Sequence, residues 1–266
     1  MNRVRVFLRR YLRSCISCCY LFLWGWTKSG HRAFLYSMGR HFGWEPRSIG
    51  ALPEVNIDDI TSNYTNIAII NLSGIQGNVS LIETIAINKL IKEQQPTGVM
   101  EIGTFDGRTT LNMAANTPSQ TVIYTLDLPP QALSSTVLPL APGDEQYIVK
   151  PMSGACFFNT ASASKIKQLY GDSASFDFAP YNGAISFVFV DGAHSYEYVI
   201  SDSHKALELI GDRAGLVLWH DYGNPWWPDV TKAIENLQAT DPRFRNIKRI
   251  RNTNLCFLVV SVENML

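Results

Sequence analysis

Hydrophobic residues recur at helical spacing immediately after residue 80. Ser80 can cap a helix there, and Glu83 three positions later completes a capping box. The segment LIETIAINKLIKE carries the apolar residues Leu81, Ile85, Ile87, Leu90 and Ile91 at this spacing. Pro96 stops the pattern, because proline cannot continue a helix. We therefore expect an amphipathic helix at residues 81–93, at the start of the main domain.

Short apolar runs then alternate with further helical stretches. The expected strands are GVMEIG (98–103), VIYTLDL (122–128), IKQLYGD (166–172), ISFVFVD (185–191) and GLVLWHD (215–221). The expected helices between and after them are residues 108–116, 195–210 and 229–239. This alternation is typical of a parallel sheet that helices cover on both faces. Residues 246–252 and 254–262 are close enough in sequence to form a hairpin on that sheet.

The sequence thus predicts an α/β fold with a Rossmann-like, doubly wound, mostly parallel seven-stranded sheet, helices on both faces and a C-terminal antiparallel hairpin. A chain of 266 residues, 46% of them hydrophobic, can bury a core of this size. We divide it into an N-terminal extension at 1–50, a linker and lead-in segment at 51–79, and one main domain at 80–266.

Charge sets the N-terminal extension apart from the rest. Residues 1–50 hold nine Arg or Lys against one acid, which leaves a net charge of +8 there and −8 in the remainder. The apolar stretch 16–26 is shorter than the ~20 residues that a membrane-spanning helix needs. A signal peptide is not favoured either, because no small-x-small cleavage site precedes the Trp-rich stretch.

The extension has the pattern of an amphipathic helix. Its apolar positions, Val4, Leu8, Tyr11, Leu12, Cys15 and Cys19, recur at helical spacing, and most of them are separated by the arginines Arg5, Arg9, Arg10 and Arg13. Such a helix suits an anionic membrane surface. It suits equally well a place on the protein's own core or on a second subunit, so peripheral membrane contact and homo-oligomerisation both stay open.

Five cysteines without a disulfide framework indicate a reducing compartment, so we expect a cytoplasmic protein. Three of them crowd together at positions 15, 18 and 19, but no second Cys or His pair stands at zinc-site spacing. A nucleic acid partner is not expected, because the basic residues are concentrated in the extension while the main domain is acidic.

Polar side chains stand at or near the carboxyl end of each expected parallel strand. They are Glu101, Asp127, Asp172, Asp191, and His220 with Asp221. Ligands of open α/β sheets collect at this edge. An acid that ends a strand is often only the cap of the next helix, so the argument rests on the set rather than on any one member.

The first turn of this set has the form of a ligand-binding loop. In EIGTFDGRTT, Gly103 and Gly107 permit a tight backbone and close approach of a ligand. The loop does not fit G-x-G-x-x-G, because Phe105 stands at the middle glycine. Asp127 can accept bonds from two ribose hydroxyls. Asp172, with the neighbouring backbone at Ser173, can hold an adenine amino group. Together these residues describe a nucleoside pocket without a pyrophosphate cradle.

In this order and spacing, the residues resemble the class I S-adenosylmethionine-dependent methyltransferases over roughly residues 80–260. The resemblance implies S-adenosylmethionine as cofactor, held by Glu101, Gly103, Gly107, Asp127, Asp172 and Ser173. Within that class, VDGAHSYEYV and LWHDYG are similar to segments of the metal-dependent macrolide sugar O-methyltransferases. This closer resemblance implies that Asp191 and Asp221 bind a divalent cation and that His194 is the general base.

One position departs from those enzymes. His220 stands where they carry an acid, so the candidate metal ligands are Asp191, His220 and Asp221. Mg²⁺ prefers oxygen ligands, and this set leaves Mg²⁺, Mn²⁺, Fe²⁺ and a metal-free site open. A cation would lower the pKa of a bound hydroxyl, and an imidazole with an ordinary pKa of ~6.5 could then take its proton near neutral pH.

The resulting hypothesis is O-methylation of a hydroxyl on a small-molecule or glycan acceptor. The segment from Pro129 to Lys165 is long enough to include a lid, and Trp226 and Trp227 can stack on a sugar or a flat ring or pack against the N-terminal extension. The alternative is an inactive nucleoside-binding fold that serves as an interaction subunit. Such a module would need Asp127 and Asp172 but would have no use for Asp191, His194 and Asp221 together.

Overall fold

A computed structural model describes residues 2–27, 31, 35, 50–72 and 74–261 of the chain. The chain divides into two compact units, Met1–Ile49 and Gly50–Leu266. In the first unit, helix α1 (Asn2–Trp24) continues into the short 3₁₀ helix η1 (Gly25–Thr27). Among the described helices, none is both long enough and apolar enough to cross a membrane.

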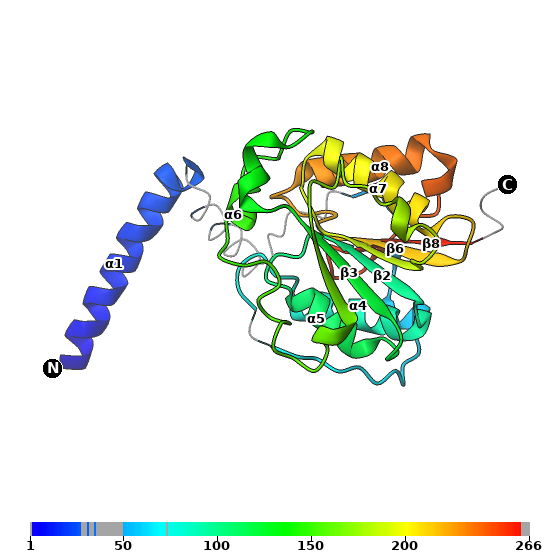
Figure 1. Ribbon diagram of the computed structural model, residues 1–266. Helices are drawn as coiled ribbons and strands as arrows, with labels where there is room; N and C mark the ends of the chain where they lie inside the picture. The colour runs from blue at the N-terminus through cyan, green and yellow to red at the C-terminus, as the bar shows by residue number, and fades with distance from the viewer. Residues whose placement is uncertain (1, 28–30, 32–34, 36–49, 73, 262–266) are drawn as a thin grey trace. The chain divides into compact units, whose positions relative to one another are not determined.

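The second unit is built on one sheet of eight strands (Figure 1). The strands are β1 (Glu54–Val55), β2 (Gly98–Ile102), β3 (Val122–Asp127), β4 (Ile166–Tyr170), β5 (Phe187–Val190), β6 (Gly215–Trp219), β7 (Lys248–Ile250) and β8 (Cys256–Val260). Their order across the sheet is β1-β7-β8-β6-β5-β2-β3-β4.

The predicted fold class is confirmed. Strands β2 to β6 pair in parallel, whereas β8 pairs antiparallel with both β6 and β7. The structure adds an eighth strand to the seven expected, because the two-residue β1 pairs in parallel with β7 at the edge of the sheet. β1 lies in the segment that we expected to be a linker, and two residues are too few to show a strand pattern.

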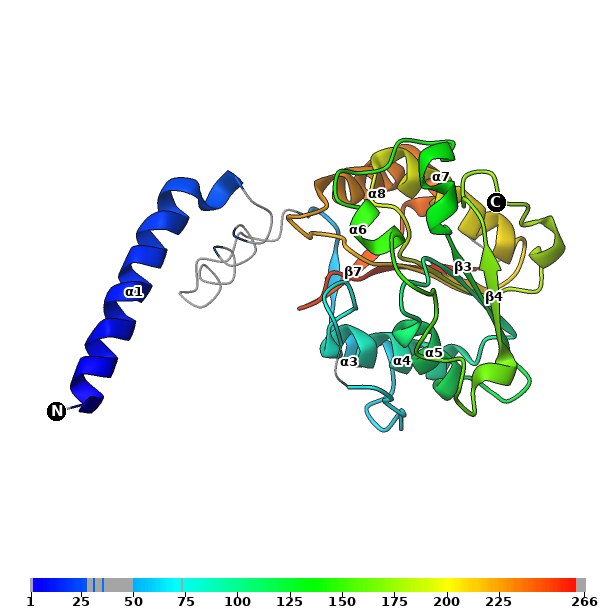
Figure 2. The same ribbon diagram turned by 60° about the vertical axis from the view of Figure 1, so that its left-hand side comes forward.

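Helices cover both faces of the sheet, as Figures 1 and 2 show from two sides. One layer contains α4 (Leu81–Gln94) and α5 (Arg108–Asn116), and the other contains α7 (Tyr196–Ile210) and α8 (Pro228–Thr240). Two further short helices are α3 (Ile57–Ile60) and α6 (Glu145–Ile148). The expected capping box at Ser80 and Glu83 begins α4.

Strand β5 shows why a continuous apolar run suits the centre of this sheet. Its side chains alternate between the two layers: Phe187 and Phe189 pack in the cluster that contains α4 and α5, whereas Val188 and Val190 pack in the cluster that contains α7 and α8. All four side chains are buried. A strand covered on both faces has no solvent-facing position, so polar residues appear only after it ends.

The polar residues that follow β5 lie at the place where the chain reverses its direction of strand addition. β3 and β4 continue the sheet on one side of β2, while β5 and β6 continue it on the other. The carboxyl ends of β2 and β5 therefore border the topological switch point, which is the usual ligand site of an open α/β sheet.

Candidate functional site

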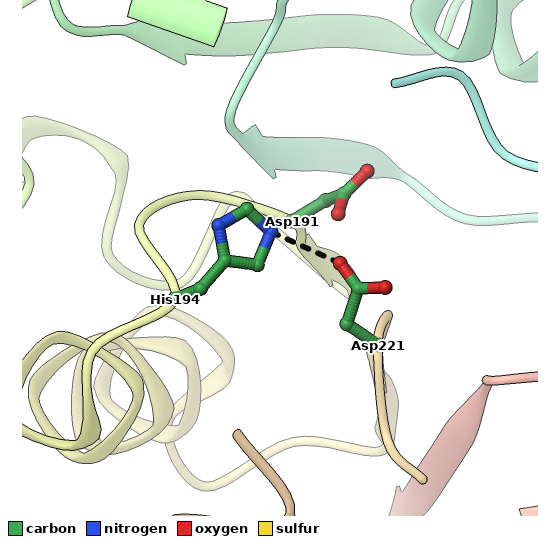
Figure 3. Close-up of side chains that lie close together, drawn as sticks. All are labelled: Asp191, His194 and Asp221. Carbon is green, nitrogen blue, oxygen red and sulfur yellow. Dashed lines mark hydrogen bonds and ion pairs between the residues drawn. The ribbon is translucent and has the colours of Figure 1, made fainter. Parts of the chain in front are cut away.

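His194 lies at the centre of a group of buried acids. Its Nδ1 lies 2.5 Å from Oδ1 of Asp144, and its Nε2 lies 2.9 Å from Oδ2 of Asp221. The ring stacks on Trp227, with 3.9 Å between ring centroids and an interplanar angle of 11°. Figure 3 shows the ring of His194 facing the carboxylates of Asp191 and Asp221. Every polar edge of the imidazole is thus engaged by an acid.

Local structure fixes this position of His194. β5 ends at Val190, and the loop that follows it carries Asp191 and His194 before Ser195 caps α7 by accepting a hydrogen bond from the Tyr198 amide. Asp221 follows the neighbouring strand β6 and adopts a left-handed backbone conformation with φ of 62°. A non-glycine residue in this conformation is strained, and such strain is concentrated at functional sites.

Asp144 is a member of the site that the sequence did not reveal. It stands at the N-terminus of α6, fifty positions before His194, and it is buried. Its Oδ2 accepts hydrogen bonds from the amides of Ala141 and His194, at 2.9 and 3.3 Å, while Oδ1 faces the imidazole. No motif marks this acid, and the length of the segment from Pro129 to Lys165 is the only sequence signal near it.

His220 lies among three carboxyl groups, one of which, Asp221, it shares with His194. Its Nδ1 lies 3.0 Å from Asp191 Oδ1 and 3.3 Å from Asp221 Oδ2. Its Nε2 lies 3.4 Å from Glu83 Oε2, which is an ion-pair distance rather than a hydrogen bond. Glu83 also caps α4 and accepts a hydrogen bond from the Asn254 amide. His220, which stands where an acid was expected, is therefore surrounded by carboxyl groups.

The acids and the two imidazole rings of this group stabilise each other's charged forms. Burial disfavours charged imidazole rings, but the hydrogen bonds and negative charge of Asp144 and Asp221 raise the pKa of His194 to about 9. Asp221 and Asp191 likewise raise the pKa of His220 well above its usual value despite burial. In return, His220 and His194 hold the pKa of Asp221 well below its usual value. The surrounding acids thus favour the charged imidazolium form of both rings.

Asp191 is the acid whose ionised form this arrangement disfavours. Burial raises its pKa, and the nearby negative charge of Asp221 adds to the effect, although His220 opposes both. Four carboxyl groups (Glu83, Asp144, Asp191 and Asp221) thus share two imidazole rings. A site with this excess of acids favours the arrival of a further positive charge.

Among the described residues, Asp191, His194 and Asp221 form one group that could hold a metal ion. One potential ligand atom from each lies within 4.8 Å of the others. His220, which the sequence suggested as a ligand, is outside this group and directs Nδ1 at both carboxylates. Two carboxylates and one imidazole suit Mn²⁺ or Fe²⁺ at least as well as Mg²⁺.

The predicted glycine turn lies beside this group. Gly103 follows β2 with φ of 100°, and a Cβ atom there would lie 2.0 Å from the carbonyl oxygen of Asp191. Only glycine can bring the two strand ends this close. Phe105 adopts the left-handed conformation as well, with φ of 50°, although this costs a non-glycine residue roughly 1 kcal/mol. Gly107, with φ of 81°, precedes α5.

The proposed ribose-binding acid is paired within the protein. Oδ2 of Asp127 lies 2.7 Å from Nζ of Lys150 and also accepts a hydrogen bond from the hydroxyl of Ser153. Both side chains of the ion pair are nearly buried. Since both contacts fall on Oδ2, Oδ1 is the oxygen of Asp127 that can accept a ribose hydroxyl. Lys150 is a second residue that the sequence did not indicate.

The remaining predicted cofactor residues lie along the same edge. Glu101 is fully buried within β2, where its Oε2 accepts hydrogen bonds from Thr110 and Thr125, and burial raises its pKa to about 8. Asp172 accepts hydrogen bonds from the amides of Val137 and Ala174 and from the hydroxyl of Tyr198. Ser173, the next residue, is buried.

The segment from Pro129 to Lys165 contributes to both halves of the site. Val137 contacts Asp172, Asp144 contacts His194, and Lys150 pairs with Asp127. Between them, the ring of Tyr147 packs edge-on against Phe105 and Trp227, with centroids 5.7 and 6.3 Å apart. The segment predicted to include a lid thus links the nucleoside-side acids to the His194 group.

Comparison with known proteins agrees with this architecture. Residues 100–222 match a family model described as a methyltransferase domain, and the matched range runs from within β2 to beyond β6 and includes Asp127, Asp191, His194 and Asp221. With the sheet order and the strand-end site above, this match is consistent with a class I S-adenosylmethionine-dependent methyltransferase. The matched domain indicates an enzyme of methyl transfer. A search of curated proteins finds no significant match.

Several solved structures are similar at low identity. Cofactor-bound Rv0187 from MTB is 16% identical over 70% of this chain and 83% of its own, with a TM-score of 0.48. TomG from Streptomyces achromogenes, an O-methyltransferase involved in tomaymycin synthesis, is 15% identical over 69% and 82%, with a TM-score of 0.47. An O-methyltransferase from Bacillus cereus is 15% identical over 70% and 84%, with a TM-score of 0.48.

Proposed function

We propose that this methyltransferase transfers a methyl group from S-adenosylmethionine to a hydroxyl oxygen of a small-molecule or glycan acceptor. The observation that carries the proposal is the position of His194. It stands between two buried acids at the carboxyl end of β5, beside the topological switch point of the sheet. A hydroxyl is a poor nucleophile until it loses its proton, so a positioned histidine is the group that this acceptor requires.

Asp144 gives the two nitrogens of His194 different roles. When the neutral ring donates its Nδ1 hydrogen to Asp144, Nε2 is left as the proton acceptor. Nε2 faces Asp221, whose negative charge now favours the imidazolium form. Positive charge placed beside Asp221 competes for this carboxylate and therefore lowers the pKa of His194. When a positive charge lies beside Asp221, His194 is therefore more readily present as the neutral base.

S-adenosylmethionine supplies a methyl group on a positively charged sulfur, which an oxygen nucleophile displaces in line. The residues of this chain have to hold the two reactants in that alignment. We assign Asp127 Oδ1 to the ribose hydroxyls and the turn from Gly103 to Gly107 to the close approach of the nucleoside. The left-handed conformations of Gly103, Phe105 and Gly107 support this assignment, because they form a tight turn at the strand end that lets a ligand approach the backbone closely.

We further propose that Asp191 and Asp221 hold a divalent cation. Support comes from the donor set, from the raised pKa of Asp191 and from the excess of carboxyl groups over imidazole rings. Such a cation would lower the pKa of the acceptor hydroxyl. His220 then acts through Asp191 and Asp221, because its ring orients both carboxylates.

An inactive nucleoside-binding subunit is not favoured. That function would use Asp127 and Asp172 alone, yet the chain gathers Asp144, Asp191 and Asp221 around His194 at the same edge. Grouping so many acids lowers the stability of the fold. A function of the whole group explains why the chain retains them. Labelled methyl transfer, described in the Discussion, tests the proposed activity directly.

Cofactor binding provides a separate test. Asp127→Ala should weaken binding of S-adenosylmethionine and S-adenosylhomocysteine by about 10- to 100-fold in calorimetry, because it removes a hydrogen bond to a charged group and leaves Lys150 unpaired. Asp212→Ala is the matched control, since Asp212 is exposed in the loop before β6. Unchanged affinity in Asp127→Ala would contradict the ribose assignment.

A further inference from the structure

Helix α1 carries an apolar face and a basic face. Val4, Phe7, Leu8 and Tyr11 follow one another at spacings of three and four residues, which places them on one side of the helix. The rings of Phe7 and Tyr11 stack with centroids 6.2 Å apart. These apolar side chains are exposed, at 64% for Val4 and 55% for Leu8. Large exposed apolar faces mark interaction surfaces.

The opposite side of the same helix is strongly cationic. Arg5, Arg9, Arg10 and Arg13 are all exposed, and α1 contains no acidic residue. Since long arginine side chains can extend their charge outward from an apolar surface, this side suits a layer of anionic groups. Charge complementarity therefore specifies an acidic partner.

The second half of the helix narrows the choice of partner. Residues 14–27 contain no charged side chain, and their large apolar residues point in all directions around the helix axis. Ile16 and Trp24 are exposed at 61% and 53%, and Trp26 follows in η1. A protein partner covers one side of a helix, whereas acyl chains can surround it. Tryptophan is also favoured at the boundary of a bilayer.

We propose that α1 anchors this enzyme to an anionic lipid surface as an interfacial helix. The uncharged half reaches about 20 Å, less than the ~30 Å of a bilayer core, so it enters one leaflet without crossing. The arginine-bearing half lies along the headgroups. A second copy of the chain is a less suitable partner, because a helix without acidic residues leaves the arginine side without an acidic counterpart. This inference does not depend on the acceptor or on the role of His194.

Flotation of the full-length protein with vesicles tests the anchor. The protein should float with vesicles of phosphatidylcholine and phosphatidylglycerol, bind pure phosphatidylcholine far more weakly, and dissociate as salt rises. Replacing Arg5, Arg9, Arg10 and Arg13 with Gln should lower the partition coefficient on the order of 100-fold or more. Replacing the same four with Lys should preserve binding, because the charge is kept.

Two further variants separate the anchor from general attraction of charge. A control that replaces four exposed cations of the second unit, Lys167, Lys232, Arg245 and Lys248, with Gln should float like the wild type. Leu8→Ser with Leu12→Ser should weaken binding on the order of 10-fold, since apolar burial contributes to anchoring. Equal binding to both vesicle types, no binding to either, or self-association through α1 without lipid binding would overturn the proposal.

Discussion

Replacing His194 with alanine is expected to lower the turnover number by about 10²- to 10⁴-fold, which is the usual contribution of a general base. Binding of S-adenosylmethionine should persist, because Asp127 and the turn at Gly103 lie on other strand ends. Calorimetry with S-adenosylhomocysteine and initial rates with saturating acceptor distinguish the two effects. The loss should appear in kcat.

His204→Ala is the matched control for this variant. His204 lies on α7, is more exposed than His194, and forms an ion pair of 3.4 Å with Asp241. It should retain nearly full turnover. If His194→Ala also keeps nearly full turnover at neutral pH, His194 is not the base. Asp144→Asn should show an intermediate loss in kcat, since the ring remains but loses the acid that orients it.

Exhaustive chelation is expected to abolish methyl transfer, and added Mn²⁺ or Mg²⁺ should restore it. The physical reason is that Asp191 and Asp221 place two carboxylates beside each other, and the acceptor hydroxyl loses its activation when the cation is removed. The measurement is the transfer rate before chelation, after it and after each metal is returned. Elemental analysis of the purified protein identifies the metal that it carries.

Cofactor binding serves as the control for chelation. Affinity for S-adenosylhomocysteine should stay within a few-fold of its starting value, because the proposed nucleoside residues are distinct from the metal ligands. Asp221→Asn should reproduce the chelated enzyme and resist rescue by metal. Full activity after chelation, in protein without bound metal, would remove the cation from the account while leaving His194 in place.

Much of the fold was accessible from the sequence because buried strands have a strong local signal. The run from Phe187 to Val190 is apolar at every position, and the structure buries every one of them between two helical layers. The cap at Ser80 and Glu83 was likewise local and is confirmed. The strand β1 was missed because two residues at a sheet edge carry almost no pattern.

The candidate site was accessible only in part. Asp191, His194 and Asp221 could be placed together, because they follow neighbouring strands at one edge of the sheet. Asp144 and Lys150 reach the site from an irregular segment, and no periodicity indicates where such a segment folds back. Trp227 was expected to stack on an acceptor or to pack against the N-terminal extension, and the structure stacks it on His194.

The acids around His220 show a second limit of prediction from sequence alone. His220 was placed among the candidate metal ligands because it stands where the similar enzymes carry an acid. Its neighbour Glu83, however, is 137 positions away and was interpreted as a helix cap alone. Burial favours the neutral form of Glu83, but His220 lowers the pKa of this acid to about 2. Only the folded arrangement reveals that one side chain serves both roles.

Transfer of an isotopically labelled methyl group is the most direct test of the account. Wild-type enzyme, labelled S-adenosylmethionine and a cell extract containing small molecules and glycans should yield a product that carries the label on a hydroxyl oxygen, as fragmentation in mass spectrometry can establish. In the same incubation, His194→Ala should decrease the yield of that product by at least about 10²-fold. A label found only on nitrogen or carbon, or equal product from both enzymes, would contradict the proposed chemistry.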